Sequence, residues 1–374
     1  MGQQVTTAGD VGPGGISAAD RAHLLRYTEG LWDALRGQQL FVTGGTGFLG
    51  CWVLEAFTAA NAQHGLGATA VVLTRDPDGF ARHAPPLAAD PAIRLHQGDV
   101  RSFAFPSGRF AYVIHGAGSP NARLNAEEPL LMVETLVQGT RHTLEFARQA
   151  GAKRVLLMSS GAIYGPQPVG VTHQPEEALQ APDTTRPRSA YAEGKRMAEL
   201  LCAIYNERCG LSTIIARCFA FLGPYQQIDS QFATGNFIRD ALTGGPIRVT
   251  GDGRTVRSYL YGADLAVWLW HLLLRGAPGR AYNVGSEHAL TITELAHVVA
   301  GLCQPAPAVH QANAPTSSPP DVYVPSTHRA RTELGLAQRI GLEDAIQRTC
   351  AWHRARRGST DAVARTASVV EANR

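Results

Sequence analysis

The chain has 374 residues, of which 44% are hydrophobic and 17% charged, a composition typical of a globular protein large enough for two coupled lobes. Its formal net charge is only +3 and it has no long run of like charges, which argues against nucleic acid as a partner. No apolar run approaches the roughly 18 residues that a membrane helix requires, so we expect no membrane partner.

The first 37 residues predict a tail and one accessory helix. Residues 1–16 are rich in Gly, Thr and Gln, a composition that favours disorder. Ser17 is a suitable N-cap for a helix that continues to about Leu35, and Gly37 ends it. We expect this helix to pack on the main body of the protein.

Residues 38–222 alternate short apolar segments with helical patterns. Strands are expected at 40–43, 70–74, 93–96, 112–115, 155–159 and 212–219. One helix should begin at about Phe48, and two stronger helical patterns cover 127–150 and 189–208. Strands that alternate with helices indicate an α/β domain built on a doubly wound parallel sheet, with helices on both faces.

Beyond Gly223 the pattern changes to short helices, short strands and turns. Helices are expected near 232–242, 263–274 and 293–302, and a Pro- and Ala-rich loop at 304–320. Gly251-Asp252-Gly253 predicts a hairpin turn. We assign residues 223–356 to a smaller α/β lobe that interleaves in part with the first domain, and 357–374 to a loose tail.

A glycine-rich turn, Thr43-Gly44-Gly45-Thr46-Gly47-Phe48-Leu49-Gly50, follows the first strand and opens the first helix. A pyrophosphate must approach the backbone N–H groups at a helix N-terminus closely, and side chains would block it. Because the strand–turn–helix context is met, the turn predicts a Rossmann-type domain that binds NAD or NADP. The candidate cofactor contacts are Gly44, Gly47, Phe48, Leu49 and Gly50.

The second and third strands end in residues that can contact the adenosine half of the cofactor. In Thr74-Arg75-Asp76, Arg75 favours the phosphate of NADP, whereas Asp76 can bind a ribose hydroxyl of NAD. The alternative is a solvated Arg–Asp turn, and the choice between NAD and NADP stays open. Asp99 and Val100 follow the third strand, where the adenine ring would lie.

Tyr191 and Lys195 are four residues apart on a predicted helix, so their side chains share one face. A free tyrosine has a pKa of about 10 and is a poor base at neutral pH. A neighbouring ammonium and the positive nicotinamide ring both favour the phenolate. Tyr191 and Lys195 therefore also border the cofactor, since Lys195 can hold the nicotinamide ribose. Ser160 ends the fifth strand, where its hydroxyl can bind the reacting oxygen.

The chain resembles the extended short-chain dehydrogenase/reductases, specifically the nucleotide-sugar epimerase/dehydratase group. The resemblance runs from about Leu40 to Arg354. Besides the glycine turn and Tyr191 with Lys195, it rests on Ser159-Ser160-Gly161-Ala162-Ile163-Tyr164-Gly165, Arg217-Cys218-Phe219, Gly223-Pro224, Gly235-Asn236-Phe237-Ile238-Arg239, Gly251-Asp252-Gly253, Arg257-Ser258-Tyr259, Asp264-Leu265 and Asn283-Val284-Gly285.

The resemblance implies a nucleotide-diphosphate sugar as substrate and a C-terminal lobe that mainly binds it. It makes Ser160, Tyr191 and Lys195 the catalytic trio, and Ser160 also a substrate contact. Asn236 and Arg257 would hold the diphosphate, with a surface salt bridge as the alternative for Arg257, and Ser119 would touch the substrate. It also implies a homodimer formed through the helices expected at 127–150 and 189–208.

Two departures from the family bear on the reaction. Its 4,6-dehydratases carry an Asp-Glu pair after the catalytic Ser or Thr, and its decarboxylases usually keep the Glu, but this chain has Gly161 and Ala162. Ala220 replaces an Asn that many members have. We therefore expect a C4 epimerase with tightly bound NAD, then a 4-keto-sugar reductase, then a decarboxylase or dehydratase with an unusual acid and base. The retained trio argues against a non-catalytic dinucleotide sensor.

The six cysteines form no C-x-x-C pair and no Cys/His cluster with the spacing of zinc ligands. We expect free thiols, no metal site and a reducing compartment. The N-terminus shows no secretory signal, so the expected location is the cytoplasm. The nucleotide base and the sugar leave no signature in the sequence.

Overall fold

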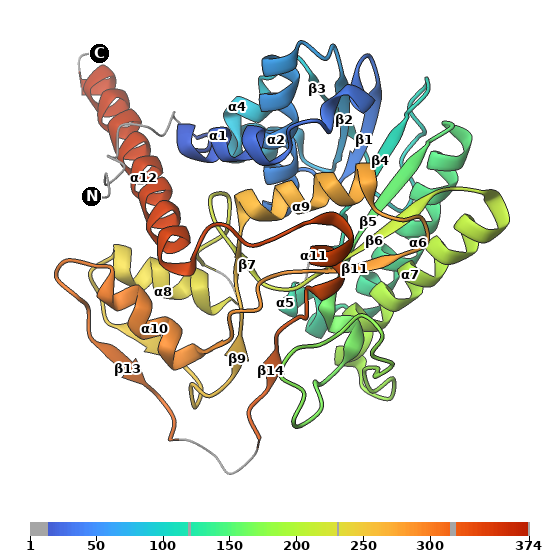
Figure 1. Ribbon diagram of the computed structural model, residues 1–374. Coiled ribbons are helices and arrows are strands. Elements are labelled where there is room, and N and C mark those ends of the chain that lie inside the picture. The colour runs from blue at the N-terminus through green and yellow to red at the C-terminus, as the bar shows by residue number, and fades with distance from the viewer. Residues whose placement is uncertain (1–13, 119–120, 230–231, 315–318, 373–374) are drawn as a thin grey trace.

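The computed structural model describes residues 14–118, 121–229, 232–314 and 319–372, with backbone only from 358 onwards (Figure 1). Its centre is a seven-stranded sheet in the order β11-β6-β5-β4-β1-β2-β3, in which every pair is parallel. The strands are β1 (Gln39–Thr43), β2 (Thr69–Thr74), β3 (Ile93–Gln97), β4 (Tyr112–His115), β5 (Arg154–Ser160), β6 (Thr213–Cys218) and β11 (Ala281–Val284). The predicted Rossmann-type doubly wound sheet is confirmed.

Both faces of the sheet are buried because consecutive strand residues point to opposite sides. Leu40 and Val42 of β1 pack in one cluster with Trp52, whereas Phe41 packs in the other with Phe146. The first face is covered by α2 (Phe48–His64) and α9 (Gly262–Arg275), the second by α6 (Pro129–Gln149) and α7 (Ala190–Cys209). Short helices α3 (Pro77–His83), α4 (Pro85–Ala88) and α5 (Ala122–Glu127) complete this part.

The six predicted strands are present, and their ends differ from the predicted ends by no more than one residue. The seventh, β11, was not predicted, and it pairs with β6 although it lies in the segment assigned to the C-terminal lobe. The helix expected at 127–150 is confirmed as α6, which begins at Pro129. The short helix α5 before it ends at Glu127 and was not predicted, and Pro129 separates the two because it cannot continue the ladder of helical hydrogen bonds.

The single N-terminal helix expected from Ser17 to Leu35 was wrong. The chain forms α1 (Ala18–Tyr27) and a separate 3-10 turn at Trp32–Leu35. Gly30 lies between them in the left-handed conformation, with φ +74°, which an α-helix does not accommodate. Of the segment expected to be disordered, residues 1–13 lie outside the described part, whereas Ile16 is buried in the core.

Helix α1 is joined to the main body by buried polar contacts. Asp20, only 1% exposed, accepts hydrogen bonds from Arg348 (2.7 Å) and from the Tyr261 hydroxyl (2.9 Å). His23 bonds to Asp264 at 2.8 Å. Arg348 belongs to α12 (Leu342–Ala372), so the expected packing on the main body is observed and extends to the C-terminal helix.

The C-terminal lobe contains α8 (Ala233–Leu242), α10 (Ile292–Gly301) and α11 (His328–Leu334), and three small sheets. These pair β7 (Phe221–Leu222) with β10 (Leu260–Tyr261), β8 (Ile247–Val249) with β13 (Val309–Gln311), and β9 (Val256–Arg257) with both β12 (Leu290–Thr291) and β14 (Val322–Tyr323).

Three expectations for this region were wrong. The turn Gly251-Asp252-Gly253 is not a hairpin, because β8 and β9 on either side of it belong to different sheets. The loop expected at 304–320 contains β13, which pairs in parallel with β8. The tail expected to be loose continues α12 as helical backbone to Ala372. Within the described residues, no helix is long and apolar enough to cross a membrane.

Candidate active site

The glycine turn leads from the carboxyl end of β1 into α2, and its glycines have no room for side chains. A Cβ on Gly44 would lie 2.4 Å from the backbone of Gly116, and one on Gly50 would lie 2.3 Å from the Gly44 carbonyl oxygen. Gly47 is the N-cap of α2 and leaves the first N–H groups of the helix without a side-chain cap. Phe48 and Leu49 are partly buried against the core in the first turn. The turn therefore fits a dinucleotide pyrophosphate.

The end of β2 borders a small pocket of about 210 Å³ next to this turn. Both Arg75 and Asp76 line it, together with Thr46 of the glycine turn. Asp76 also accepts a hydrogen bond from the Gly79 N–H at 2.8 Å and so caps α3. The pocket suits an adenosine ribose, because Asp76 and Arg75, both predicted to contact the ribose, lie at its edge.

Asp99 follows β3 as predicted, but its carboxylate is already paired. It accepts hydrogen bonds from the backbone N–H and the guanidinium of Arg101, both at 2.9 Å. The side-chain hydrogen bond of Arg101 lowers the pKa of Asp99. Val100 is buried in the core against Gly139. The Asp-x-Arg spacing was the available signal for Arg101, and sequence reasoning missed it.

The structure brings the predicted catalytic trio together at the carboxyl edge of the sheet. Ser160 is the last residue of β5, and Tyr191 lies in the first turn of α7 with Lys195 one turn further on. The neighbouring Ser160 hydroxyl acts to lower the pKa of Tyr191. The Lys195 ammonium donates to the Met158 carbonyl at 2.7 Å and lies 6.0 Å from the centre of the Tyr191 ring.

Burial governs the electrostatics of this group. It lowers the pKa of Lys195 to about 8, an effect that the neighbouring Cys218 and Glu199 oppose. It raises the pKa of the Tyr191 hydroxyl well above its ordinary value, and hydrogen bonding to Ser160 opposes that rise. For Tyr191 to act as a base, the site must supply groups that favour the phenolate.

Phe219 and Tyr323 fill the space beside the serine. A Cβ on Gly161 would lie 2.6 Å from the Phe219 ring. The Phe219 ring packs against Tyr323 with 4.6 Å between centroids. The Tyr323 hydroxyl donates to the carbonyl oxygen of Cys218 at 3.4 Å, and Cys218 is the register partner of Ser160. Sequence reasoning missed Tyr323 because it lies on a two-residue strand with no local motif.

The buried carboxylates near β5 are bound to structural partners. Glu199 forms an ion pair with Arg217 at 2.8 Å and accepts a hydrogen bond from Ser159 at 2.5 Å. Glu176 accepts from the backbone N–H of Asn283 at 2.9 Å, and burial raises its pKa. All six cysteines are free, and among the described residues no cluster of His, Cys, Asp or Glu can hold a metal ion.

The predicted diphosphate-binding residues are not brought into one group with the trio. Arg257 forms an ion pair with Asp321 at 2.6 Å, and its guanidinium lies 5.5 Å from the centre of the Tyr323 ring. The salt-bridge alternative for Arg257 therefore describes this structure, although Tyr323 connects it to the site. Asn236 accepts a hydrogen bond from Arg239 on the same helix at 3.2 Å. Ser119 lies outside the described residues.

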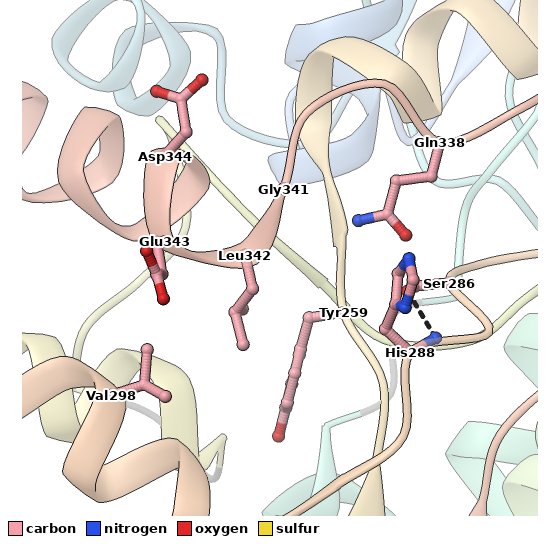
Figure 2. Close-up of a pocket in the computed structure, with 9 residues that line it drawn as sticks. All are labelled: Tyr259, Ser286, His288, Val298, Gln338, Gly341, Leu342, Glu343 and Asp344. Atoms are coloured by element: carbon pink, nitrogen blue, oxygen red, sulfur yellow. Dashed lines mark hydrogen bonds between the residues drawn. The ribbon is translucent and has the colours of Figure 1, made fainter. Parts of the chain in front are cut away.

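A larger pocket of about 450 Å³ lies apart from this site (Figure 2). It is lined by Tyr259, by Val298 of α10 and by the first turn of α12 at Leu342, Glu343 and Asp344. No member of the trio lines it. The candidate site is therefore defined by its side-chain chemistry and not by the size of a cavity.

A glycine turn on a parallel sheet, followed by Ser, Tyr and Lys at its carboxyl edge, defines a dinucleotide-dependent enzyme on a Rossmann-type fold. The description "NAD dependent epimerase/dehydratase family" matches residues 40–285. The chain belongs to this family, which confirms the resemblance. The family is NAD dependent, which confirms the predicted nicotinamide cofactor.

Individual relatives are nucleotide-sugar enzymes of several kinds. UDP-glucuronic acid decarboxylase 1 of Arabidopsis thaliana is 28% identical over 83% of this chain and 68% of its own length. The structure of DesIV, a dTDP-glucose 4,6-dehydratase from Streptomyces venezuelae with NAD bound, is 27% identical with a TM-score of 0.74, over 86% of this chain and 98% of that one. UDP-glucose 4-epimerase from Thermotoga maritima shares the fold at 21% identity and a TM-score of 0.72, over 85% and 99%.

Proposed function

We propose that this protein is an NAD-dependent nucleotide-sugar epimerase that acts at C4 through a transient 4-keto sugar. One observation carries the proposal: the two residues after Ser160 have no group that can transfer a proton. Gly161 is closed off by the Phe219 ring, and Ala162 has only a methyl group. An enzyme that oxidises and then reduces the same carbon needs the trio and no further acid or base.

Tyr191, as the phenolate, accepts the proton of the C4 hydroxyl. The Ser160 hydroxyl donates to the same sugar oxygen and steadies its charge as the carbonyl forms. The Lys195 ammonium, one helical turn from Tyr191, favours the phenolate. Bound NAD, held by the glycine turn, would supply the hydride acceptor and donor for C4, and return of the hydride to the other face of the keto sugar would invert that carbon. Tyr191 then gives the proton back to the oxygen, so the mass and oxidation state of the sugar are unchanged.

The residues around the glycine turn fit the cofactor. The open N–H groups at the start of α2 suit its pyrophosphate, and the pocket beside Arg75 and Asp76 suits its adenosine ribose. Gly44 and Gly50 allow the tight backbone packing of this turn, against Gly116 and against Gly44 itself.

Relatives named as decarboxylases and dehydratases raise the alternative of a lyase. Elimination of water calls for acid–base groups beyond the trio, whereas a 4-keto uronate is a β-keto acid that loses carbon dioxide and then needs only a proton at C5. The buried carboxylates in this region are Glu176 and Glu199, and both are bound to structural partners. A keto-sugar reductase needs only the trio, and Arg75 at the ribose pocket favours it as the second candidate, with NADPH as the reductant.

The test is incubation of the pure protein with UDP-, dTDP-, GDP- and CDP-sugars, with and without added NADH or NADPH, followed by mass spectrometry and NMR. A product of unchanged mass with inverted C4 and no net cofactor use would support the epimerase. A gain of two hydrogens with NADPH consumed would make it a reductase. Loss of water or of carbon dioxide would refute the argument from Gly161 and Ala162.

We also propose a homodimer formed through α6 and α7. Both helices cover one face of the sheet with their inner sides, yet both expose large apolar side chains on their outer sides. These are Leu130 and Val133 on α6, and Met197, Leu200 and Ile204 on α7. A second copy of the same helix pair would cover these side chains in a symmetric interface.

A further inference from the structure

Helix α3 forms one wall of the pocket that suits the adenosine ribose. Gly79, Phe80 and His83 of this helix line the pocket, together with Asp76 at its N-cap. The helix has only seven residues. A helix this short is marginally stable in water on its own, so contacts with other elements must keep this wall of the pocket in place.

The C-terminal end of α3 is capped by a side chain of the C-terminal helix. The guanidinium of Arg356 on α12 donates to the carbonyl oxygen of His83 at 2.7 Å and to that of Arg82 at 3.4 Å. The last carbonyls of a helix have no partner within the helix and form the negative end of its dipole. A guanidinium at this end therefore satisfies the carbonyls and stabilises the dipole, across 273 positions of the chain.

Aromatic side chains hold Arg356 in place and connect α12 to α3 a second time. The Arg356 guanidinium lies over the Trp352 ring, 4.8 Å from its centre. Trp352 is 3% exposed, and its indole N–H donates to the carbonyl oxygen of Gly15 at 2.9 Å. Tyr225 packs against both Trp352 and His83, with 5.2 and 5.8 Å between the ring centres. The side chain that ends α3 is therefore linked to α12 as well.

Tyr225 also joins this contact to the helix that begins at the glycine turn. Its hydroxyl donates to the carboxylate of Glu55 on α2. Tyr225 is buried and has a φ of 71°, a backbone conformation that a residue with a side chain adopts only where its surroundings hold it there. Helices α2, α3 and α12 are thus packed together around one buried tyrosine, and two of these helices border the candidate cofactor site.

We propose that Arg356 is a positioning residue for the cofactor: by holding the C-terminal end of α3, it keeps the ribose pocket in the shape that binds the adenosine half of NAD. The inference rests on the assignment of this pocket to the ribose and not on the reaction that follows. It makes the affinity for NAD depend on α12, which lies after residues 40–285 that match the family. A site that is formed in only a fraction of the molecules binds with an affinity reduced by that fraction.

The experiment measures the dissociation constant of NAD for the full chain, freed of bound nucleotide, in the wild type and in Arg356→Met. Methionine keeps an apolar side chain over Trp352 but has no donor for the carbonyls of α3. The dissociation constant should rise about five- to tenfold, and that of ADP-ribose, which shares the adenosine half, by the same factor. Arg356→Lys keeps a cationic donor and should show a smaller rise. Arg354→Met removes an exposed charge from the same helix and should leave both constants unchanged.

Hydrogen exchange followed by mass spectrometry tests whether the effect passes through α3. In Arg356→Met the amides of residues 77–84 should exchange faster, whereas those of α2 should exchange as in the wild type. Three results would overturn the inference: unchanged exchange in α3, faster exchange with unchanged affinity for NAD, or a loss for NAD that ADP-ribose does not share. An equal loss in Arg354→Met would do the same, because it would indicate a general effect of charge. No sugar is present in these measurements, so failure of the proposed epimerase reaction would leave their outcome unaltered.

Discussion

The ring of Phe219 lies against the α-carbon of Gly161, so that a methyl group added there would come within 2.6 Å of the ring. The two residues follow the ends of the neighbouring strands β6 and β5. The ring occupies the space that a side chain at residue 161 would need, and this explains why the position directly after the serine is a glycine.

Gly161→Ala should therefore destabilise the protein by about 1–3 kcal/mol, the usual cost of overpacking a filled core. Thermal and denaturant unfolding would measure it. The same change should cost less in a Phe219→Leu background, where the ring is gone. Gly301→Ala is a matched control, since nothing lies within 4 Å of the added methyl group. Equal losses in both backgrounds would mean that the Phe219 contact is not the cause.

Tyr191→Phe should lower kcat by about 10²–10⁴-fold, the typical contribution of a general base, while leaving NAD binding and stability near those of the wild type. Product formation from the accepted nucleotide sugar would measure kcat, and calorimetry would measure NAD binding and stability. Tyr205→Phe on the same helix is the control, because its hydroxyl bonds to Glu145, away from the site. Retention of most activity in Tyr191→Phe would show that Tyr191 is not the general base.

Asp76→Ser should raise the affinity for NADP relative to NAD by about tenfold. The change removes a negative charge from the edge of the ribose pocket but keeps an oxygen that can cap α3. Dissociation constants for both cofactors would show it, with Asp78→Ser in the first turn of the same helix as the control. An unchanged ratio would indicate that Asp76 only caps the helix and that Arg75 decides the preference.

Arg348→Met should destabilise the protein by about 3 kcal/mol, because it leaves the buried Asp20 carboxylate without its cation. Much of the loss should be recovered when Asp20→Asn is added. Arg36→Met breaks an exposed ion pair with Asp33 and should cost no more than about 0.5 kcal/mol. Equal unfolding transitions for Arg348→Met and Arg36→Met would contradict a structural role for the α1–α12 contact.

Leu200→Glu combined with Ile204→Glu should convert the proposed dimer into a monomer, since it places two charges in the apolar face of α7. Light scattering coupled to size-exclusion chromatography would report the mass. Leu179→Glu changes a side chain that is 93% exposed outside both helices and should leave the mass unaltered. A wild-type monomer would refute the dimer itself.

Local patterns were enough to predict the sheet and much of the candidate site. The glycine turn is recognised within eight residues, and Tyr191 with Lys195 within five, because one strand–turn–helix unit or one helix face holds each group. The continuous apolar run of a strand such as β1, buried on both faces, is likewise a local property. These features need no knowledge of which distant segments meet.

The features that the sequence did not predict all depend on contacts between segments far apart in the chain. β11 joins β6 across more than 60 residues, and β8 pairs in parallel with β13, which turned a predicted hairpin into two separate sheets. Tyr323 reaches the Cys218 carbonyl, beside Ser160, only because β14 folds back beside β9. Arg257 was expected to hold a diphosphate, and its pairing with Asp321 follows from the same fold-back. Neither residue carries a sequence signal for its partner.

The bond between Asp20 and Arg348 joins residues 328 positions apart. During synthesis, α1 leaves the ribosome long before α12 has been made, and until then its carboxylate has no Arg348 to pair with. Contacts this distant along the chain close late and slow folding, because the intervening loop must first be ordered. The N-terminal helix is thus expected to dock among the final steps, and pulse proteolysis during refolding would find α1 cleavable after the sheet is protected. Until α1 docks, this helix is exposed to proteases and chaperones.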